Sequence, residues 1–290
     1  MGTILVRYNE IGLKSDPVRR RLEGILKRNM IDMLANDSIE AIVTRSNARL
    51  YVETEDVDGA IRSLRKVFGI ASTSVADVCN ADLETIRKTV SAISKELLIP
   101  GETFAIDARR DGGSYGFTSM DLEKDLGTAV LAANPDKGIK VNLTRPDKTI
   151  FVEVRSSKAY IFTSYIRCHA GLPLGSQGKV LAYVDSDRGV LSAWLMMKRG
   201  CKVIVHGDHR VDLLEKYDPH LKRIRDDGNV PENVLGYVTG EGLEQLNDSE
   251  ITNLPVFMPT IGMSDGTVGN LIDLMMRDRI QSVDVVYNRI

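Results

Sequence analysis

The sequence predicts a mixed α/β and α+β protein with more than one domain, and three observations lead to this prediction. Segments of the first 78 residues follow the order β-α-β-β-α-β, which is typical of a ferredoxin-like fold. A second mixed set of helices and strands continues to residue 165. From residue 180, short apolar strands alternate with helices, which indicates a doubly wound parallel sheet. With 290 residues, the chain is long enough for two or three hydrophobic cores.

The N-terminal unit is expected to begin with a strand over residues 3–8. Asp16 and Pro17 then predict the start of a helix, because aspartate can cap the first turn and proline lacks only an N–H that this turn leaves unused. The other elements expected here are strands near residues 39–45 and 49–54, a helix with Val57, Ile61, Leu64 and Phe68 inward, and a strand over residues 70–78.

The second unit is expected to begin with a helix that follows Asp82 and ends before Pro100. Another helix should start at Thr118, which forms a capping-box pattern with Asp121. This second helix should bury Leu122, Leu126, Val130 and Leu131, and the strands of the unit are expected near residues 103–108, 139–143, 149–154 and 158–165.

A glycine-rich connector at residues 171–178 leads into the third unit. Between residues 205 and 235 there is room for about one helix, broken at Pro219. Ligands of doubly wound sheets bind at the carboxyl ends of the strands, so we expect residues 184–189, 239–241 and 259–260 along one edge. The strands are expected over residues 180–184, 202–205, 235–238, 256–258 and 283–287.

Composition restricts the classes of partner and compartment. The 38 basic and 40 acidic side chains give a net charge of -2, so any nucleic-acid site must be a local concentration of cations. No apolar run approaches the roughly 20 residues that a membrane span requires. Cys79, Cys168 and Cys201 are widely spaced and odd in number, which favours a reducing compartment over a disulfide framework. We therefore expect a cytoplasmic protein with no membrane partner.

Ten short stretches, spread over nearly the whole chain, carry a resemblance to a known family. They are RYNEIGLK at residues 7–14, FAIDARR at 104–110, TSMDLEKDLG at 118–127, RPD at 145–147, VEVR at 152–155, GLPLG at 171–175, GKV at 178–180, AWLMMKRG at 193–200, VTGE at 238–241 and PTIGM at 259–263. In this order they resemble the tRNA 4-thiouridine synthetase (ThiI) family.

The resemblance implies an N-terminal ferredoxin-like domain over residues 1–75 and a THUMP RNA-binding domain over residues 76–168, which grips the acceptor end of tRNA. A shortened PP-loop domain, of the ATP pyrophosphatase type, would occupy residues 169–290. In active members this last domain uses ATP to adenylate O4 of a tRNA uridine, after which a persulfide delivers sulfur. The family also implies a link to thiamine sulfur pathways and a homodimer.

The first turn of the third unit departs from the family pattern. Active members carry Ser-Gly-Gly-x-Asp-Ser there, and the glycines let backbone N–H groups close around the pyrophosphate of ATP. The same six positions here are Val184, Asp185, Ser186, Asp187, Arg188 and Gly189. A carboxylate 4 Å from a phosphate costs about 4 kcal/mol at an effective dielectric constant of about 20. The sequence therefore predicts a degenerate PP-loop, with these six residues as a vestigial nucleotide site.

Two further residues match the family pattern near this turn. Glu241 and Gln245 follow a predicted strand and would line the same vestigial cleft. The alternative is structural, since a carboxylate at a helix N-terminus stabilises the helix dipole.

Basic residues of the second unit are the candidates for RNA contacts. Arg109 and Arg110, together with Lys124 and Arg145 on neighbouring elements, are expected to contact phosphates, and Lys14 would extend that surface. The alternative is an ordinary solvated charged face.

The sequence offers no evident catalytic residue, cofactor or metal site. Cys201 and His206 lie at opposite ends of one predicted strand, about 16 Å apart, too far for one ion. The neighbouring Cys168 and His169 would point to opposite sides of an extended segment, which disfavours an activated thiolate.

The leading hypothesis is a tRNA-binding, ThiI-like protein that lacks normal ATP-dependent uridine adenylation and acts with a sulfur donor or an active paralogue. The alternative is an active ATP-dependent tRNA uracil 4-sulfurtransferase in which Arg188 or Lys179 holds phosphate. A third possibility is that the α/β domain serves mainly as a homodimer platform. Whether the chain is an enzyme stays open at this point.

Overall fold

The computed structural model describes residues 1–46, 49–111, 115–224, 233–245 and 253–277. It divides into two compact units, which we describe one at a time. The first unit comprises Met1–Val6, Thr44–Val57 and Thr73–Ile166, and the second comprises Arg7–Val43, Asp58–Ser72 and Arg167–Ile290. The division passes through the N-terminal β-α-β-β-α-β segment, whose order of elements is as predicted.

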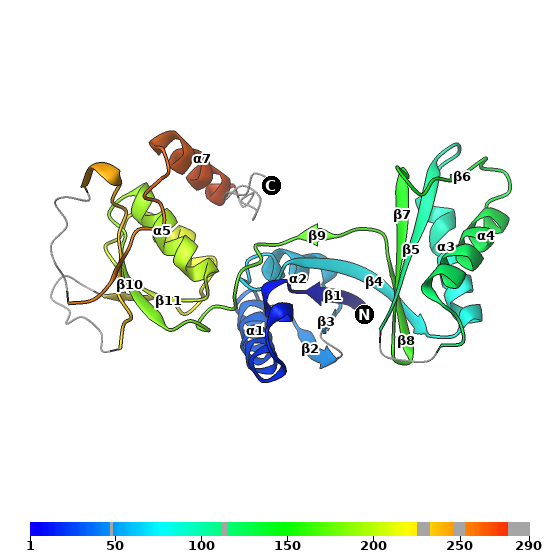
Figure 1. Cartoon of the computed structure of the whole chain (residues 1–290), viewed down its shortest axis with the longest axis horizontal. Helices are drawn as coiled ribbons and strands as arrows, with labels where there is room; N and C mark the ends of the chain where they lie inside the picture. Colours follow the sequence, from blue (N-terminus) through cyan, green and yellow to red (C-terminus); the bar gives the residue numbers. More distant parts are fainter. Residues whose placement is uncertain (47–48, 112–114, 225–232, 246–252, 278–290) are drawn as a thin grey trace. The chain divides into compact units, whose positions relative to one another are not determined.

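A mixed sheet, with nine strands among the described residues, forms the first unit in the order β2-β3-β1-β4-β8-β7-β5-β6, and β9 pairs with β4 (Figure 1). Its strands are β1 (Gly2–Arg7), β2 (Ala41–Ser46), β3 (Arg49–Thr54), β4 (Ser72–Asn80), β5 (Thr103–Asp111), β6 (Lys140–Val141), β7 (Lys148–Arg155), β8 (Lys158–Phe162) and β9 (Ile166–Arg167).

The pairing of β4 with β8 makes this sheet continuous. The two strands run antiparallel, with Asp77 opposite Ile161, and so connect the N-terminal strands to those of the second predicted unit. Tyr51 of β3 and Tyr160 of β8 stack with ring centroids 5.0 Å apart and close an apolar cluster over the junction. The sequence predicted the strands but not this connection.

Helices α3 (Leu83–Leu97) and α4 (Ser119–Ala133) cover one face of the β5, β7 and β8 part of the sheet (Figure 1). The predicted capping box is confirmed, because Thr118 and Asp121 exchange side-chain to backbone hydrogen bonds in both directions. Leu122 and Leu126 are buried as expected. The prediction for Leu131 is wrong: its side chain is 40% exposed, on the face of α4 away from the sheet.

Helices α1 (Asp16–Asn36) and α2 (Val57–Leu64) form where helices were predicted. Of the four residues expected inward near α2, Leu64 and Phe68 are buried, whereas Val57 and Ile61 are only partly buried, and Phe68 lies beyond the end of the helix. Asp16 is the first helical residue of α1 and not its cap, which corrects the expected role of its side chain. Ser15, at the cap position, makes no side-chain capping bond, and Asp16 accepts a hydrogen bond from Arg19 at 2.5 Å.

A second sheet, entirely parallel, forms the C-terminal part of the second unit in the order β12-β11-β10-β13-β14. The helices of this part of the chain are α5 (Asp187–Lys198), α6 (Asp212–Glu215) and α7 (Asp265–Met276), and all three contribute to one core with the sheet. Trp194 of α5 is completely buried in the core. The strands are β10 (Lys179–Tyr183), β11 (Lys202–His206), β12 (Lys222–Ile224), β13 (Tyr237–Val238) and β14 (Val256–Phe257).

The parallel sheet confirms the predicted class but differs in detail. Between residues 205 and 235 the chain forms the short helix α6 and then β12, a strand that the sequence did not predict. The strand expected over residues 283–287 lies outside the described residues. From β10 the chain first adds β11 and β12 on one side and then β13 and β14 on the other, so the direction of winding changes at β10. Within the described residues, no helix has the length and apolarity needed to cross a membrane.

The capping box of α4 generates a stability prediction. Thr118→Ala removes the acceptor for the Asp121 N–H and should lower the free energy of unfolding by about 1 kcal/mol. Thr128→Ala on the same helix is the matched control, because the Thr128 hydroxyl only returns to the Lys124 carbonyl and its loss should be close to neutral. Urea denaturation measures both, and equal losses would show that the cap has no special role.

Candidate RNA and nucleotide sites

Arg109 and Arg110 are adjacent on β5 and therefore lie on opposite faces of the sheet. Both side chains are exposed. Arg109 lies beside Asp107, with Nε 3.3 Å from Oδ1. Arg110 is on the face that α3 and α4 cover, beyond the end of the core, and its guanidinium carbon lies 5.9 Å from the centre of the Tyr115 ring. The two arginines do not form one contact surface.

Lys124 lies near Arg110 at the beginning of α4. Hydrogen bonds from Thr118 lower the pKa of Asp121, and the charges of Lys124 and Arg110 lower it further, so both cations lie close to that carboxylate. Tyr115 stacks on Phe117 at 5.9 Å between ring centroids. Arg110, Lys124 and this aromatic pair form a mixed cationic and aromatic surface that the sequence did not predict.

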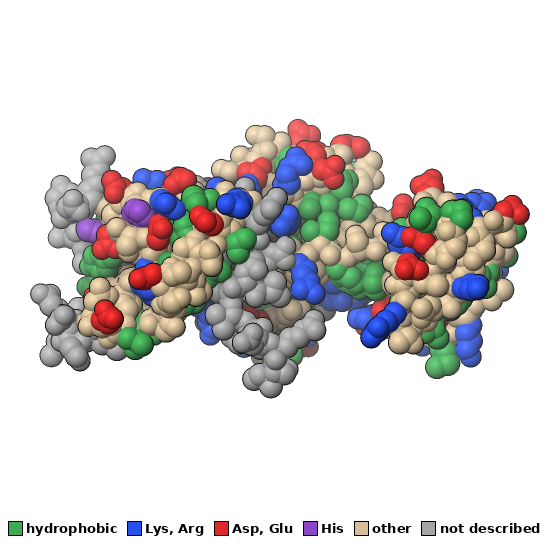
Figure 2. Space-filling view, turned by 90° about the horizontal axis from the view of Figure 1, so that it is seen from above, with side chains coloured by type: hydrophobic (Ala, Val, Ile, Leu, Met, Phe, Trp, Pro, Cys, Tyr) green, Lys and Arg blue, Asp and Glu red, His purple; other side chains and the backbone are tan. Residues whose placement is uncertain are grey.

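Arg145 and Lys14 lie elsewhere. Arg145 is held by Asn142, whose backbone N–H donates to the Phe104 carbonyl at the beginning of β5. Arg110 is at the other end of this strand, about 20 Å away. Lys14 is exposed and belongs to the second unit. On the face shown in Figure 2, basic side chains are interspersed with acidic ones.

The turn after β10 is ordered by the chain's own polar groups. Val184 is buried, and its carbonyl accepts a hydrogen bond from the His209 N–H at 3.1 Å. Ser186 caps α5, with its Oγ accepting from the Gly189 N–H at 3.2 Å. Ser186 has extended backbone angles, with φ -151° and ψ 165°, which any residue can adopt. Asp185 is exposed, and its carboxylate lies on the Gly189 side of the turn.

Asp187 places a carboxylate at the first turn of α5. Its Oδ1 lies 2.7 Å from His209 Nε2 and 3.3 Å from Arg210 Nε. A helix N-terminus favours negative charge, so the carboxylate of Asp187, the first helical residue, stabilises the N-terminus of α5.

Arg188 points into the chain and not into the turn. Its guanidinium donates to the carbonyls of Thr260 at 2.8 Å and Met263 at 3.0 Å, and it also pairs with Asp265. Lys179 is the first residue of β10, at the opposite edge of the sheet from the turn. The alternative hypothesis needs Arg188 or Lys179 to hold phosphate at this turn. Lys179 lies at the other edge of the sheet, and the guanidinium of Arg188 is bound by the chain's own acceptors.

The turns after β10 and β13 approach each other closely. A Cβ at Gly240 would lie 2.5 Å from the Gly189 nitrogen, and a Cβ at Gly189 would lie 2.5 Å from the Tyr183 carbonyl oxygen. Glu241 therefore follows directly on the contact with the Gly189 turn, and its Oε2 accepts from Thr239 Oγ1 at 3.3 Å. Gln245 Oε1 accepts from the Gly242 N–H at 2.7 Å. In the part of the chain that the structure describes, Glu241 is followed by the 3-10 helix Leu243–Gln245.

Comparisons with known proteins agree with this fold. Residues 3–74 match the model of the ThiI ferredoxin-like domain and residues 80–164 match that of the THUMP domain. A probable tRNA sulfurtransferase of Caldanaerobacter subterraneus subsp. tengcongensis is 31% identical over 317 residues, which cover 90% of this chain and 82% of the relative. The chain belongs to the tRNA sulfurtransferase (ThiI) family.

Other relatives in the ThiI family match over a shorter part of their length. A probable tRNA sulfurtransferase of Methanosarcina mazei is 38% identical over 207 residues, 70% of this chain and 51% of the relative. This chain spans about half the length of the first such relatives. The alignment with the Caldanaerobacter protein runs over more positions than the 290 residues of this chain, so that relative contains insertions that this chain lacks.

Two solved structures share the fold. The crystal structure of PH1313 from Pyrococcus horikoshii has a TM-score of 0.80 and 25% identity, and covers 95% of this chain and 100% of that protein. A 4-thiouridine synthetase, solved as a complex with RNA and bound ATP, has a TM-score of 0.75 and 22% identity over 95% of this chain and 85% of that protein.

The cysteines of this ThiI-family chain do not resemble activated nucleophiles. Burial raises the pKa of both the Cys79 and the Cys201 thiols, which favours the unreactive protonated form. Cys168 is buried. Among the described residues, no group of three or more His, Cys, Asp or Glu side chains could hold a metal ion.

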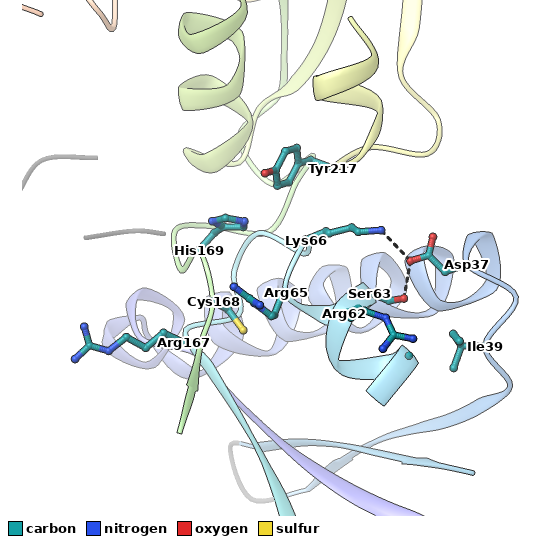
Figure 3. Close-up of a pocket in the computed structure, with 11 residues that line it drawn as sticks. Asp37, Ile39, Arg62, Ser63, Arg65, Lys66, Arg167, Cys168, His169 and Tyr217 are labelled. Carbon is teal, nitrogen blue, oxygen red and sulfur yellow. Dashed lines mark hydrogen bonds and ion pairs between the residues drawn. The ribbon is translucent and has the colours of Figure 1, made fainter. Parts of the chain in front are cut away.

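The structure also contains a cavity that the sequence did not predict (Figure 3). Three of its basic side chains come from α2 and the residues just after it, at positions 62, 65 and 66, and a fourth is Arg167. The lining also includes Asp37, His169 and Tyr217. Spacings of three and four residues place cations on one side of a helix, and this pattern could have indicated the site.

The close packing around Gly189, in the turn after β10, predicts a pair of glycine substitutions with opposite effects on stability. Gly189→Ala should lower the free energy of unfolding by about 1–3 kcal/mol, because the new methyl group would overlap the Tyr183 carbonyl. Gly269→Ala in α7 meets no atom within 4 Å and should raise stability by up to about 1 kcal/mol. Thermal and urea denaturation measure both changes, and a neutral Gly189→Ala would contradict the close approach.

Proposed function

We propose that this chain binds tRNA and that its turn after β10 does not support ATP-dependent uridine adenylation. The observation that carries the second part is the carboxylate of Asp187 at the N-terminus of α5, held there by His209 and Arg210. A nucleotide phosphate would have to displace this internal anion or bind beside it.

Three features of the turn do not fit a triphosphate. Asp185 adds a second carboxylate on the Gly189 side of the turn. The guanidinium of Arg188 is already bound by acceptors of the 260–265 segment. One like-charge contact at 4 Å costs about 4 kcal/mol at an effective dielectric constant of about 20, which is roughly a thousandfold in affinity. These residues therefore support a degenerate PP-loop.

The RNA part of the proposal rests on the family and on the first unit. The THUMP match covers the unit that carries Arg109, Arg110, Lys124 and Arg145, and the matching relatives are named as tRNA sulfurtransferases. Duplex RNA is recognised through its shape and backbone, for which dispersed exposed cations are suitable. We assign these four residues, with Lys14, to phosphate contacts near the acceptor end of tRNA.

A second candidate is an active tRNA uracil 4-sulfurtransferase with a different nucleotide arrangement. It is favoured by the turns after β10 and β13, which still meet at the change of winding direction, where ligands of such sheets bind. A sulfur donor and a homodimer are further proposals that rest on the family alone.

Titration with ATP tests the first part of the proposal. Calorimetry on the full chain should give no ATP affinity tighter than about 1 mM, because of the estimated thousandfold penalty. Addition of tRNA should not stimulate pyrophosphate release. The Caldanaerobacter relative, assayed in parallel, shows whether the conditions support the reaction. Micromolar ATP binding with tRNA-stimulated pyrophosphate release would establish the second candidate instead.

Charge reversal tests the RNA contacts. Arg109→Glu/Arg110→Glu should weaken tRNA binding and reduce the slope of log K against log salt by about 1–2, since each phosphate contact contributes about 0.7–0.9. The matched control is Lys88→Glu/Lys95→Glu, which makes the same change of charge at exposed positions on α3. An equal effect of both pairs on the slope would attribute it to net charge and remove the two arginines from the interface.

A further inference from the structure

The second unit contains a cavity of about 450 Å³ that none of the preceding functional assignments uses (Figure 3). Its volume lies within the range of small-molecule sites, about 300–1,000 Å³. It is lined by residues at the end of α2 and just after it, by His169, which precedes the connector, and by Tyr217, which follows α6.

The cavity carries an excess of positive charge. The negative charge of Asp37 is balanced within the wall, because its Oδ2 accepts from Ser63 Oγ at 2.6 Å and from Lys66 Nζ at 3.2 Å. Arg62 and Arg65 make no ion pair with any residue that the structure describes. Figure 3 shows the Arg65 guanidinium directed toward His169, while Arg167 extends away from the centre. In the same view Arg62 reaches toward Ile39, so Arg65 is the guanidinium beside His169 and Arg62 contributes positive charge elsewhere on the wall.

His169 provides an independent observation that points to a ligand. The side chain is 6% exposed, and its Nδ1 is buried without a hydrogen-bond partner. In Figure 3 the nitrogen-bearing edge of its ring faces the space beside Lys66 and Tyr217. Burial, together with the charges of Lys198 and Arg65, lowers the pKa of His169 to about 3, so the ring is neutral and offers one donor and one acceptor nitrogen. A buried polar atom without a partner is destabilising, and a bound ligand could satisfy it.

This cavity is separate from the turn after β10. His169 packs against Trp194, with ring centroids 5.4 Å apart, and lies near Lys198 at the C-terminal end of α5. The turn with Asp187 is at the other end of that helix, about 16 Å away along its axis. A ligand in the cavity therefore does not depend on the state of the PP-loop.

We propose that the cavity binds a phosphate ester, with Arg65 contacting the phosphate, His169 Nδ1 hydrogen-bonding the ester or its attached sugar, and Arg62 adding positive charge from another part of the wall. Arginine favours phosphate because its planar donors match two phosphate oxygens. The ester is either that of a small sugar phosphate or that of a nucleotide in RNA, which share this chemistry.

The test uses the full chain and ribose 5-phosphate, a probe with neither a base nor a triphosphate. Calorimetry should give a Kd below about 1 mM for the unmodified chain. Arg62→Gln/Arg65→Gln should weaken binding about tenfold or more, since hydrogen bonds to charged groups are removed. Arg21→Gln/Arg28→Gln, at exposed positions of α1 outside the cavity, is the matched control and should bind as the unmodified chain does.

His169→Phe separates a binding role from a structural one. Phenylalanine keeps an aromatic ring against Phe68, Trp194 and Tyr217 and removes the buried nitrogen. The variant should therefore melt at the same or a higher temperature and yet bind ribose 5-phosphate more weakly. Weaker binding with a lower melting temperature, retained binding in Arg62→Gln/Arg65→Gln, or no binding by the unmodified chain would overturn the proposal.

A competition experiment identifies the source of the ester. If tRNA displaces ribose 5-phosphate and Arg62→Gln/Arg65→Gln also weakens tRNA binding, the cavity receives an RNA phosphate. If tRNA and ribose 5-phosphate bind together, the cavity belongs to a small phosphorylated molecule. Both results require the phosphate site, and they differ only in what carries the phosphate.

Discussion

The first turn of α5 is the constraint on which the C-terminal sheet and its chemistry depend. A helix N-terminus presents unpaired N–H groups and a partial positive charge, and side chains, water or a ligand must supply the hydrogen-bond acceptors. In this chain Ser186 caps the helix and Asp187 supplies the negative charge, with His209 and Arg210 around it. In nucleotide-binding members of such folds a phosphate fills this position. The proposed loss of nucleotide binding therefore concerns the same helix end that these side chains stabilise.

The opposite end of α5 has the reverse arrangement. There Trp194, Phe68, His169 and Tyr217 form an aromatic cluster, with the ring of His169 about equally close to the other three. The connector passes so close to α5 that a Cβ at Gly171 would lie 2.2 Å from the Lys198 carbonyl oxygen, and φ is +77° there, so only glycine fits. This packing holds His169 at the cavity that Arg62 and Arg65 also line. The N-terminal end of α5 thus carries the carboxylate of Asp187, and the arginines of the proposed phosphate site lie near its C-terminal end.

Local patterns in the sequence were enough to predict most elements, and long-range pairing was not. Helical spacing and the Thr118 cap predicted α4, and apolar runs predicted β10 and β11. The β4 and β8 pairing joins segments about 80 residues apart and has no local signal. Strand β12 was missed because Lys222 and Arg223 make it polar, as is usual for an edge strand. The candidate sites differ in the same way: the altered turn is visible in six consecutive residues, whereas the cavity around His169 combines four separate segments.

Separation of the cations in the first unit also bears on what they can bind. Arg145 and Arg110 lie at opposite ends of β5, about 20 Å apart, and Arg109 is on the other face of the sheet. No mononucleotide could contact all three, whereas an extended polyanion that wraps around one end of the sheet could. The unit that carries them has its own core, centred on Phe104, Ile150 and Leu122, which contains no residue of the turn after β10. Neither that core nor those cations depend on the Asp187 turn, so the proposed tRNA contacts and the proposed loss of nucleotide binding can be tested separately.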